Sequence, residues 1–515
     1  MQSEEERLKV VKELRKQGIE PYGGRFERTH NAAELKEKYS MIEPDTRLEN
    51  ERVSLAGRIL SIREHGKLIF IDLKDESGQI QVYASADAMG QQQFDFIKTY
   101  LGSGDFIGVR GGIIKTKRGE LSVLSKEITL LTKSLLTLPS SWFGLKDIEA
   151  RYRQRYLDLL MNPQVKKTFG LRAKIIHALR EFLINKGFIE VHTPVLQPLY
   201  GGANARPFTT YHNELKSTLY LRIAPELYLK KLIVGGFEKV FEIGENFRNE
   251  GIDAKHNPEY TFMELYWAYA DYTDNMKLGE EMIAYIAKKV FDTTKINYHG
   301  KEIDLTPPFE RITMVDALKK YAGIDVNNLT LEGLKKIAKE KNLVVADDVT
   351  KGELIAALFE ELVEYQLIQP TFIYDYPIEV SPLAKKCLHN PAFTERFELY
   401  IMGMEIMNAY SELSDPIDQR ERFLIQMKKR AAGDEEAHPM DEDFITALKY
   451  GMPPTSGLGL GVERLVMLLT NSASIKDVIL FPQLRPEVRE PVKKEILFGD
   501  EEKDRILKRA KQKKQ

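Results

Sequence analysis

The chain has 515 residues, more than one compact domain normally holds, so we expect two or three domains. Hydrophobic residues make up 43% of the chain and the formal net charge is −2, which excludes a disordered protein and a broadly basic, non-specific nucleic-acid binder. The one cysteine, Cys387, excludes an intrachain disulfide and a zinc site built from cysteines, and it fits a cytoplasmic protein.

The N-terminal third of the chain is expected to hold a helical extension and a small barrel. Residues 1–50 are acidic at their start and lack an apolar core, so they are no signal peptide, and residues 3–17 show helical spacing that ends at Gly18. Over residues 51–136 the pattern changes to five short alternating strands separated by turns that contain glycine. This pattern predicts an OB-fold β-barrel, and residues 137–150 are expected to be a linker.

Residues 151–490 alternate between helices and strands, which predicts a second, larger domain. Helices are expected over residues 151–160 and 168–186, and a strand begins at Phe188. A mostly helical insertion is expected at about residues 278–367, and residues 491–515 are expected to form a charged, solvated tail. No apolar run approaches the length of a membrane span, so no membrane partner is expected.

Residues 247–271 contain the most informative hairpin. Arg248 can form two parallel hydrogen bonds with a phosphate or a carboxylate, which a lysine cannot do. Gly251 and Asp253 supply the turn, so Arg248 and Glu250 lie on one arm. Glu264 lies within an apolar run, where a free carboxylate is costly without a cationic partner. The hairpin therefore predicts an anion clamp beside a carboxylate that needs a cation.

Residues 457–465 (GLGLGVERL) alternate glycines before a helix. The glycines allow close approach of a ligand or a second backbone, and Arg464 lies in the first turn of the helix, where the helix dipole favours anions. As a Rossmann fingerprint the segment has the wrong spacing and lacks the acidic partner. It predicts a second anion-binding arginine.

Glu398 and Glu405 lie on either side of Met402 and Gly403, which permit a turn. On two facing strands both carboxylates reach one hard cation. Spacing alone is equally typical of two surface glutamates on a hairpin, so the residues themselves leave both interpretations open. His192, His212 and His389 lack the spacing of a metal site.

Together these segments resemble the class II aminoacyl-tRNA synthetases of subclass IIb, and their sequences are most similar to those of the lysyl members. The family signature F-R-N-E-G, H-N-P-E-[FY]-T and E-x-Y matches residues 247–251, 256–261 and 264–266, and residues 457–465 match the third signature. The helix at 168–186 with the strand that leads to Pro194 resembles the first signature. The resemblance implies an α+β fold whose larger domain is a mainly antiparallel sheet flanked by helices, and it implies a homodimer. It also implies activation of L-lysine by ATP followed by transfer to the 3′-terminal adenosine of tRNA(Lys).

The resemblance also implies a role for each matching residue. Arg248 and Arg464 would be catalytic and hold the α- and γ-phosphates, Glu250 would contact the adenine amino group and Tyr260 would stack on the ring. The further ATP-binding residues would be His256 and Asn257. The metal would be Mg²⁺, held by Glu398 and Glu405. The lysine-binding residues would be Gly202, Glu226, Arg248, Glu264, Tyr266, Asn408, Tyr410 and Glu412. The anticodon would contact Arg58, Phe70, Gln81 and Glu120 of the barrel.

The acidic residues of this set predict the substrate. Glu226, Glu264 and Glu412, expected with no basic residue facing them, suit a cationic amino acid and repel an anionic one. Two alternatives are an aspartyl or asparaginyl synthetase of the same subclass, and an enzyme that forms lysyl-adenylate but modifies a protein. A scaffold protein with an inactive catalytic domain is a third, and the presence of both arginines and of the metal glutamates opposes it.

Overall fold

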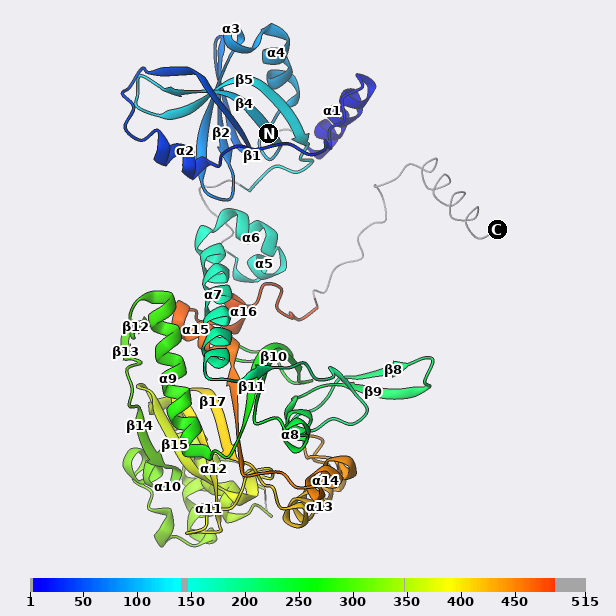
Figure 1. The fold of residues 1–515 in the computed structure, drawn as a ribbon, viewed down its shortest axis with the longest axis vertical. Helices are drawn as coiled ribbons and strands as arrows, with labels where there is room; N and C mark the ends of the chain where they lie inside the picture. The colour runs from blue at the N-terminus through cyan, green and yellow to red at the C-terminus, as the bar shows by residue number, and fades with distance from the viewer. Residues whose placement is uncertain (1–2, 140–146, 347, 487–515) are drawn as a thin grey trace. The chain divides into compact units, whose positions relative to one another are not determined.

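The computed structural model describes residues 3–139, 147–346 and 348–486, and the chain divides into two compact units, Met1–Lys146 and Asp147–Gln515 (Figure 1). Part of the expected linker, residues 140–146, and the whole expected tail, residues 491–515, lie outside the described residues. The remainder of the linker range already contains the start of helix α5 (Ile148–Arg153), which the Asp147 side chain caps.

The N-terminal unit is the five-stranded closed barrel that the sequence predicts. The strands lie in the order β1-β2-β3-β5-β4. Along β2 the odd-numbered residues Ile69 to Leu73 are buried, whereas Phe70 and Asp72 are only partly buried, which is the alternation of a barrel with one packed side. The elements of this unit are α1 (Glu4–Lys16), α2 (Ala32–Lys38), β1 (Arg47–His65), β2 (Leu68–Lys74), β3 (Gln79–Ser85), α3 (Ala86–Met89), α4 (Gln91–Tyr100), β4 (Phe106–Lys115) and β5 (Leu121–Thr132).

The second unit is built on an eight-stranded sheet in the order β14-β15-β16-β17-β18-β11-β10-β6. Only the pairs at the two edges, β6 with β10 and β14 with β15, are parallel. The mainly antiparallel sheet expected from the resemblance is therefore confirmed. Its strands are β6 (Ile189–Glu190), β10 (Lys239–Phe247), β11 (Glu259–Ala268), β14 (Glu310–Thr313), β15 (Thr371–Pro377), β16 (Phe393–Ile401), β17 (Met404–Ser411) and β18 (Thr455–Gly461).

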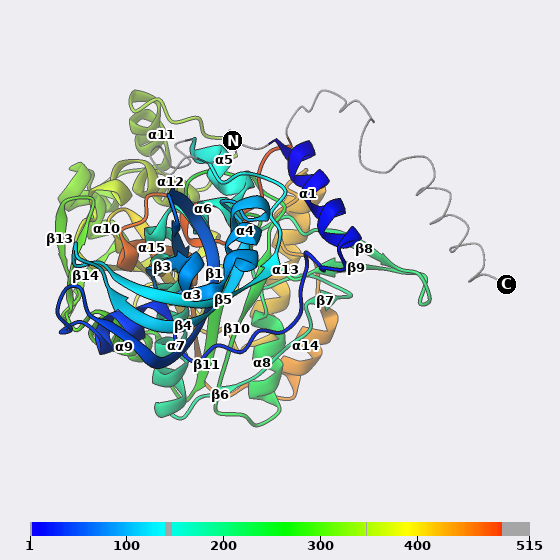
Figure 2. The same cartoon turned by 90° about the horizontal axis from the view of Figure 1, so that it is seen from above.

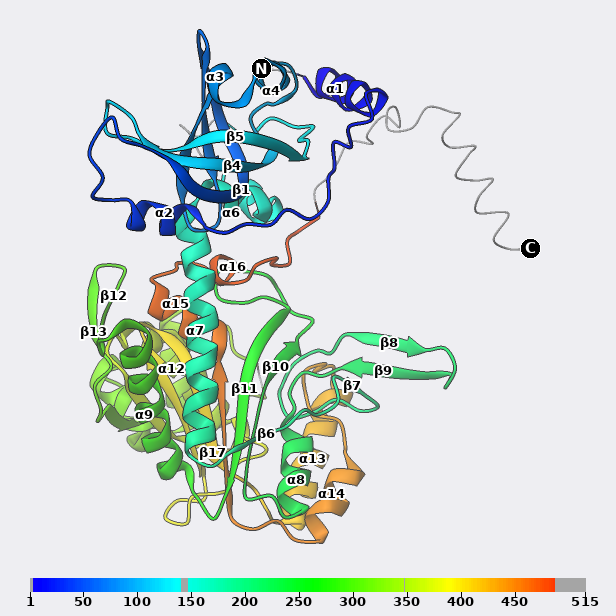
Figure 3. The ribbon, with the colours of Figure 1, turned by 45° about the horizontal axis from the view of Figure 1, so that its top comes forward.

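Helices α7 (Pro163–Asn185), α9 (Tyr272–Phe291) and α15 (Val462–Thr470) cover one face of this sheet (Figures 1 and 3). The side chains of Met263 and Leu265 of β11 point into this core, so the Glu264 side chain between them points to the opposite face. Helix α7 begins before the predicted residue 168, because Pro163 suits the first turn of a helix. The alternation thus fixes which face of the sheet carries polar chemistry.

The one helix predicted near residue 155 is two helices in the structure. The pattern over residues 151–160 forms α5 and α6 (Arg155–Met161), separated at Gln154. The break allows the buried Arg155 guanidinium to donate to Asp158 at 2.7 Å and to backbone carbonyls of residues 476, 479 and 480. These carbonyls stabilise the buried Arg155 charge, and the helical spacing of residues 151–160 cannot predict contacts with such distant residues.

The expected insertion contains strands as well as helices. Its first helix, α9, belongs to the main core, and β12 (Lys295–Tyr298), β13 (Lys301–Asp304) and β14 follow it. The helices α10 (Met314–Ala317), α11 (Leu331–Glu340) and α12 (Lys351–Leu362) then build a separate core against β15 and β16. The helical part of the insertion is therefore its second half.

The opposite face of the sheet carries α8 (Glu226–Val234), α13 (Pro416–Ala431) and α14 (Glu442–Lys449). A small sheet of β7 (Leu196–Gln197), β8 (Thr209–His212) and β9 (Ser217–Leu221) precedes α8, and β8 and β9 project from this unit as an arm (Figure 2). Among the described residues, each helix is too short or too polar to cross a membrane.

Candidate active site

A cavity of about 350 Å³ opens on the polar face of the large sheet. Strands β11, β16, β17 and β18, the loop after β10 and residues 380–384 line it. The structure brings together, in this one cavity, nearly all the catalytic-unit residues singled out from the sequence: Gly202, Glu226, Arg248, Glu250, His256, Asn257, Tyr260, Glu264, Tyr266, Glu398, Glu405, Asn408, Tyr410 and Arg464. Glu412 lies behind the cavity wall, buried beside Gly457.

Two arginines form the anion-binding end of the cavity. Arg248 follows β10, and its backbone N–H donates to the Pro258 carbonyl at 2.8 Å. Its guanidinium lies 5.5 Å from the centre of the Tyr260 ring, and its buried Nε has no hydrogen-bond partner. Arg464 of α15 donates to Glu405 Oε2 at 3.1 Å and lies 3.2 Å from His256 Nε2. A buried donor without a partner and a second guanidinium fit a phosphate ligand.

The loop between β10 and β11 is held by its own side chains. Asp253 accepts hydrogen bonds from the backbone N–H groups of Lys255 and His256 and contacts His256 Nδ1 at 2.8 Å. Asn257 donates to the Glu259 carbonyl at 2.5 Å and accepts from the Gln483 N–H at 3.2 Å. Asn257 thus positions the loop, whereas the buried Tyr260 hydroxyl lacks a partner and borders the cavity.

Glu398 and Glu405 lie on the predicted hairpin of β16 and β17, whose turn is Met402-Gly403, both with positive φ. A bulge after Glu405 places its side chain on the same face as Asn408. Glu398 accepts from the hydroxyls of Tyr376 at 2.8 Å and Tyr400 at 2.5 Å. Burial and the charge of Glu398 raise the pKa of Glu405. The carboxylate oxygens of Glu398 and Glu405 fit a hard divalent cation, whose charge would relieve the repulsion between the two carboxylates.

The acidic end of the cavity surrounds Glu264. The Tyr266 hydroxyl donates to Glu264 at 3.3 Å. Burial, followed by the charge of Glu226, raises the pKa of Glu264 well above its usual range. The charges of Arg248 and Arg222 oppose this shift only in part, and the hydrogen bond from Tyr266 is long, so the carboxylate is well suited to accept an entering ammonium group.

The expectation that no basic residue faces the acids is wrong. Lys230 of α8 is fully buried, lies 2.5 Å from Glu226 and also forms an ion pair with Glu412. Burial raises the pKa of Glu412 to about 8, and Lys230 opposes that shift. The three acids with Lys230 still carry a formal excess of two negative charges when all are ionised (three minus one). The pocket remains suited to a cation.

Comparison with known proteins agrees with this geometry. The model of the family "tRNA synthetases class II (D, K and N)" matches residues 147–485, and that of the "OB-fold nucleic acid binding domain" matches residues 53–131. The chain belongs to this class II tRNA synthetase family. A protein of Thermoanaerobacter sp. (strain X514) named lysine--tRNA ligase is 56% identical over 92% of this chain and 94% of its own length. Proteins of the same name from Moorella thermoacetica and Clostridium novyi are 54% and 53% identical, over 93% of this chain and 97% and 94% of theirs.

Three side chains of the synthetase site were not among the residues predicted from the sequence. Lys230 stands four residues after Glu226, a helical ion-pair spacing that was a usable signal. Arg396 donates to Asn408 at 3.1 Å and to Glu398 at 2.5 Å across the strands. His438 reaches the cavity from the segment before α14, and burial, with Lys230 contributing, lowers its pKa to about 4. The last two depend on tertiary contacts that spacing does not reveal.

The proposed anticodon residues lie in the barrel unit. Phe70 pairs across strands with Tyr83, at 5.5 Å between ring centres. Gln81 accepts from the Ser122 hydroxyl at 2.9 Å, and Glu120 lies two residues before Ser122. Phe70 and Gln81 therefore lie on the neighbouring strands β2 and β3, and Glu120 directly precedes β5. Arg58 pairs with Lys74 at the end of β2 and lies 4.2 Å from the Phe106 ring centre.

Gly457 of β18 lies at the floor of the pocket, where there is no room for a larger side chain. A Cβ atom at this position would lie 2.3 Å from Glu412 Oε1 and 2.6 Å from the Tyr266 ring. We expect Gly457→Ala to raise the KM for the amino-acid substrate at least about tenfold, because the acid and the tyrosine must move apart. Steady-state kinetics measures this effect, with Gly170→Ala of α7 as the control, since a Cβ atom there meets nothing within 4 Å. Equal effects of the two substitutions would contradict the role given to Gly457.

Proposed function

We propose that this synthetase is a lysine--tRNA ligase, which forms lysyl-adenylate and pyrophosphate from L-lysine and ATP and then transfers lysine to the 3′-terminal adenosine of tRNA(Lys). The observation that carries the proposal is the buried, only partly compensated Glu264 in the same cavity as Arg248 and Arg464. An ammonium group of lysine would pair with Glu264, and the phosphates of ATP would pair with the two arginines. Relatives that carry this name support the proposal. We also propose that the protein acts in the cytoplasm, where tRNA is charged for protein synthesis.

In this mechanism the protein positions the reactants and stabilises charge. Glu226, Glu264 and Glu412, with the hydroxyls of Tyr266 and Tyr410, would orient the two ammonium groups of lysine. Arg248 would hold the lysine carboxylate against the α-phosphate, and Arg464 would hold the γ-phosphate. The carboxylate oxygen attacks the α-phosphorus in line, and pyrophosphate leaves, so no protein nucleophile is needed.

The remaining site residues would complete ATP binding. Glu250 would meet the adenine amino group, Tyr260 would stack on the ring, His256 and Asn257 would shape the loop, and Gly202 would lie over the amino acid. Glu398 and Glu405, with Asn408 beside them, would hold Mg²⁺, which neutralises phosphate charge when bound.

An ATP–pyrophosphate exchange assay with lysine, aspartate and asparagine tests the proposal. We expect exchange with lysine to exceed exchange with the other two by at least about 10³-fold, because a site built for a charged group rejects a substrate that lacks it. Preference for aspartate or asparagine would overturn the substrate assignment. Exchange with lysine without charging of tRNA would instead favour an enzyme that modifies a protein.

The barrel offers a separate test of tRNA recognition. Phe70 presents a partly exposed ring to a base, so we expect Phe70→Ala to reduce charging of tRNA(Lys) by about 10- to 100-fold, from stacking worth roughly 1–3 kcal/mol. Lysine-dependent pyrophosphate exchange should not change, because it needs no tRNA. The control is Tyr22→Ala, which removes another exposed ring of the same unit. A loss of exchange in Phe70→Ala would refute an anticodon role.

We also propose that two copies form a homodimer. Strand β6 is an edge of the large sheet, and apolar side chains around it and the end of α7 are exposed: Ile184, Ile189, Val195 and Leu196. An exposed apolar edge strand is suited to pair with a second copy. Sedimentation is expected to give about twice the 59.2 kDa chain mass. Ile189→Glu should shift the protein toward the monomer, whereas Ile417→Glu, a change of another exposed isoleucine, should not.

A further inference from the structure

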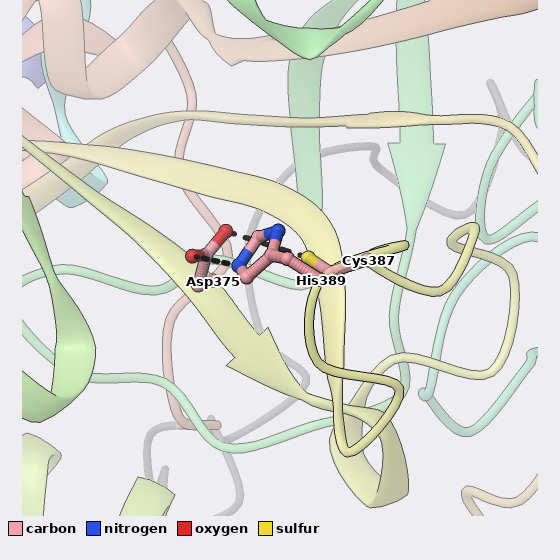
Figure 4. A group of neighbouring side chains, drawn as sticks. All are labelled: Asp375, Cys387 and His389. Atoms are coloured by element: carbon pink, nitrogen blue, oxygen red, sulfur yellow. Dashed lines mark hydrogen bonds and ion pairs between the residues drawn. The ribbon is translucent and has the colours of Figure 1, made fainter.

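A second polar cluster is formed by Asp375 of β15 with Cys387 and His389 of the connection between β15 and β16 (Figure 4). Asp375 lies where the register of β15 with β16 breaks between Tyr374 and Tyr376, so that this one residue faces both Glu395 and Arg396 of β16. Its φ is +59°, a left-handed conformation that a non-glycine residue adopts at a cost. A bulge of this kind redirects a side chain, and here it turns the Asp375 carboxylate toward the cysteine and the histidine.

The connection from β15 to β16 delivers the other two side chains. The backbone N–H of Cys387 donates to the Phe393 carbonyl at 2.9 Å, and Lys386 forms an isolated antiparallel bridge with Thr394, so this segment is held beside β16. Cys387 and His389 are two residues apart in it, and both reach the carboxylate. Cys387 Sγ lies 3.5 Å from Asp375 Oδ1, and His389 Nε2 lies 3.5 Å from Asp375 Oδ2.

Among the described residues, the ion-pair partner of the buried carboxylate is His389 and no lysine or arginine. The Asp375 side chain is 12% exposed, both contacts just described are long, and the Tyr272 side chain adds a neutral hydrogen bond. The two lysines next to Cys387 have other acidic partners, since Lys385 lies 3.7 Å from Glu395 and Lys386 lies 3.0 Å from Asp418. A cation at the centre of the cluster would supply the missing charge.

We propose that Asp375, Cys387 and His389 bind a divalent transition-metal cation of the Zn²⁺ class, at a site separate from the Mg²⁺ proposed for the catalytic cavity. The ligand atoms lie within 4.8 Å of one another, and in a tetrahedral zinc site they lie roughly 3.3–3.8 Å apart, so shifts of about 1 Å would close the site. The sulfur and imidazole ligands select Zn²⁺ or Co²⁺ over Mg²⁺. Binding forms a metal–thiolate bond and releases the thiol proton to solvent.

The arrangement leaves a route for the ion. Cys387 is 1% exposed, whereas the His389 side chain is 68% exposed, so the imidazole forms the outer side of the site. Water would take the fourth position. The metal would fasten the β15–β16 connection to β15, and residues 380–384 of the same connection line the catalytic cavity.

Titration of the full-length, chelator-treated protein with Co²⁺ tests the proposal. The chain has one cysteine, so a thiolate-to-cobalt charge-transfer band identifies Cys387 as a ligand without ambiguity. We expect this band to appear at one equivalent, to disappear on addition of Zn²⁺, and to resist excess Mg²⁺.

Variants separate this site from an unspecific one. Cys387→Ser should abolish the band, and His389→Ala and Asp375→Asn should weaken Co²⁺ binding by at least about tenfold. His212→Ala is the matched control, since His212 is also exposed but lies on β8, and it should leave the titration unchanged. Absence of the band, or a band that survives His389→Ala with unchanged affinity, would overturn the proposal. Because His389 is exposed, its substitution does not threaten folding, and the readout is independent of synthetase activity.

Discussion

Replacement of Arg248 with lysine is expected to slow lysine-dependent pyrophosphate exchange by about 10²–10³-fold, the usual loss when one donor to a developing charge is removed. The substitution keeps the positive charge, so its effect isolates geometry. Arg248 has a buried Nε without a partner and stands over the Tyr260 ring. A lysine ammonium is a point charge that cannot bridge the lysine carboxylate and a phosphate oxygen in one plane.

The acidic residues around Arg248 keep the group charged. Burial opposes its ionisation, but Tyr260, Glu250, Glu405 and Glu264 raise its pKa on balance. The guanidinium is therefore available at any pH at which the protein is folded, and the activity ratio between Arg248→Lys and the wild type should not change with pH. Single-turnover measurement of adenylate formation checks the rate. Arg420→Lys, a change of a half-exposed surface arginine, is the control. A loss of less than tenfold would show that charge alone suffices.

Much of the site was predictable because local patterns carried it. The hairpin that holds Arg248 and the one that holds Glu398 and Glu405 each bring together residues close in sequence. The OB barrel was predictable for the same reason, since each of its strands shows alternation and its turns contain glycine. In these places short-range pattern and tertiary structure agree.

Other features depended on contacts between distant segments. The break between α5 and α6 exists because Arg155 reaches carbonyls more than 300 residues away. Asp375 joins Cys387 and His389 only because of a strand bulge, and a pattern of alternate residues cannot predict a bulge. The register bulge of β17 likewise places Glu405 beside Asn408 although their numbers differ by three.

Glu264→Gln is expected to raise the KM for lysine by about 30-fold or more, since truncation of one member of a buried charged pair costs roughly 2–5 kcal/mol. Gln keeps the shape and the hydrogen bond with the Tyr266 hydroxyl but removes the charge. The KM for ATP should stay within about twofold, because the phosphates would bind at the arginine end of the cavity. Steady-state exchange kinetics with each substrate varied in turn measures both constants. Similar losses for lysine and ATP would contradict the assignment of Glu264.

The same substitution should stabilise the ligand-free protein, and the pH dependence shows why. Burial and Glu226 raise the pKa of Glu264 in the folded protein, so the folded state binds the proton more tightly than the unfolded state. This carboxyl group therefore costs no stability below its ordinary pKa and costs progressively more as the pH rises toward the raised value. Gln removes that cost, so thermal unfolding without ligand should show a gain for the variant that grows from acidic to neutral pH. Saturating lysine should reverse the order, because only the wild type offers the ammonium its charged partner. A variant less stable than the wild type at neutral pH without ligand would show that Glu264 is already compensated within the protein.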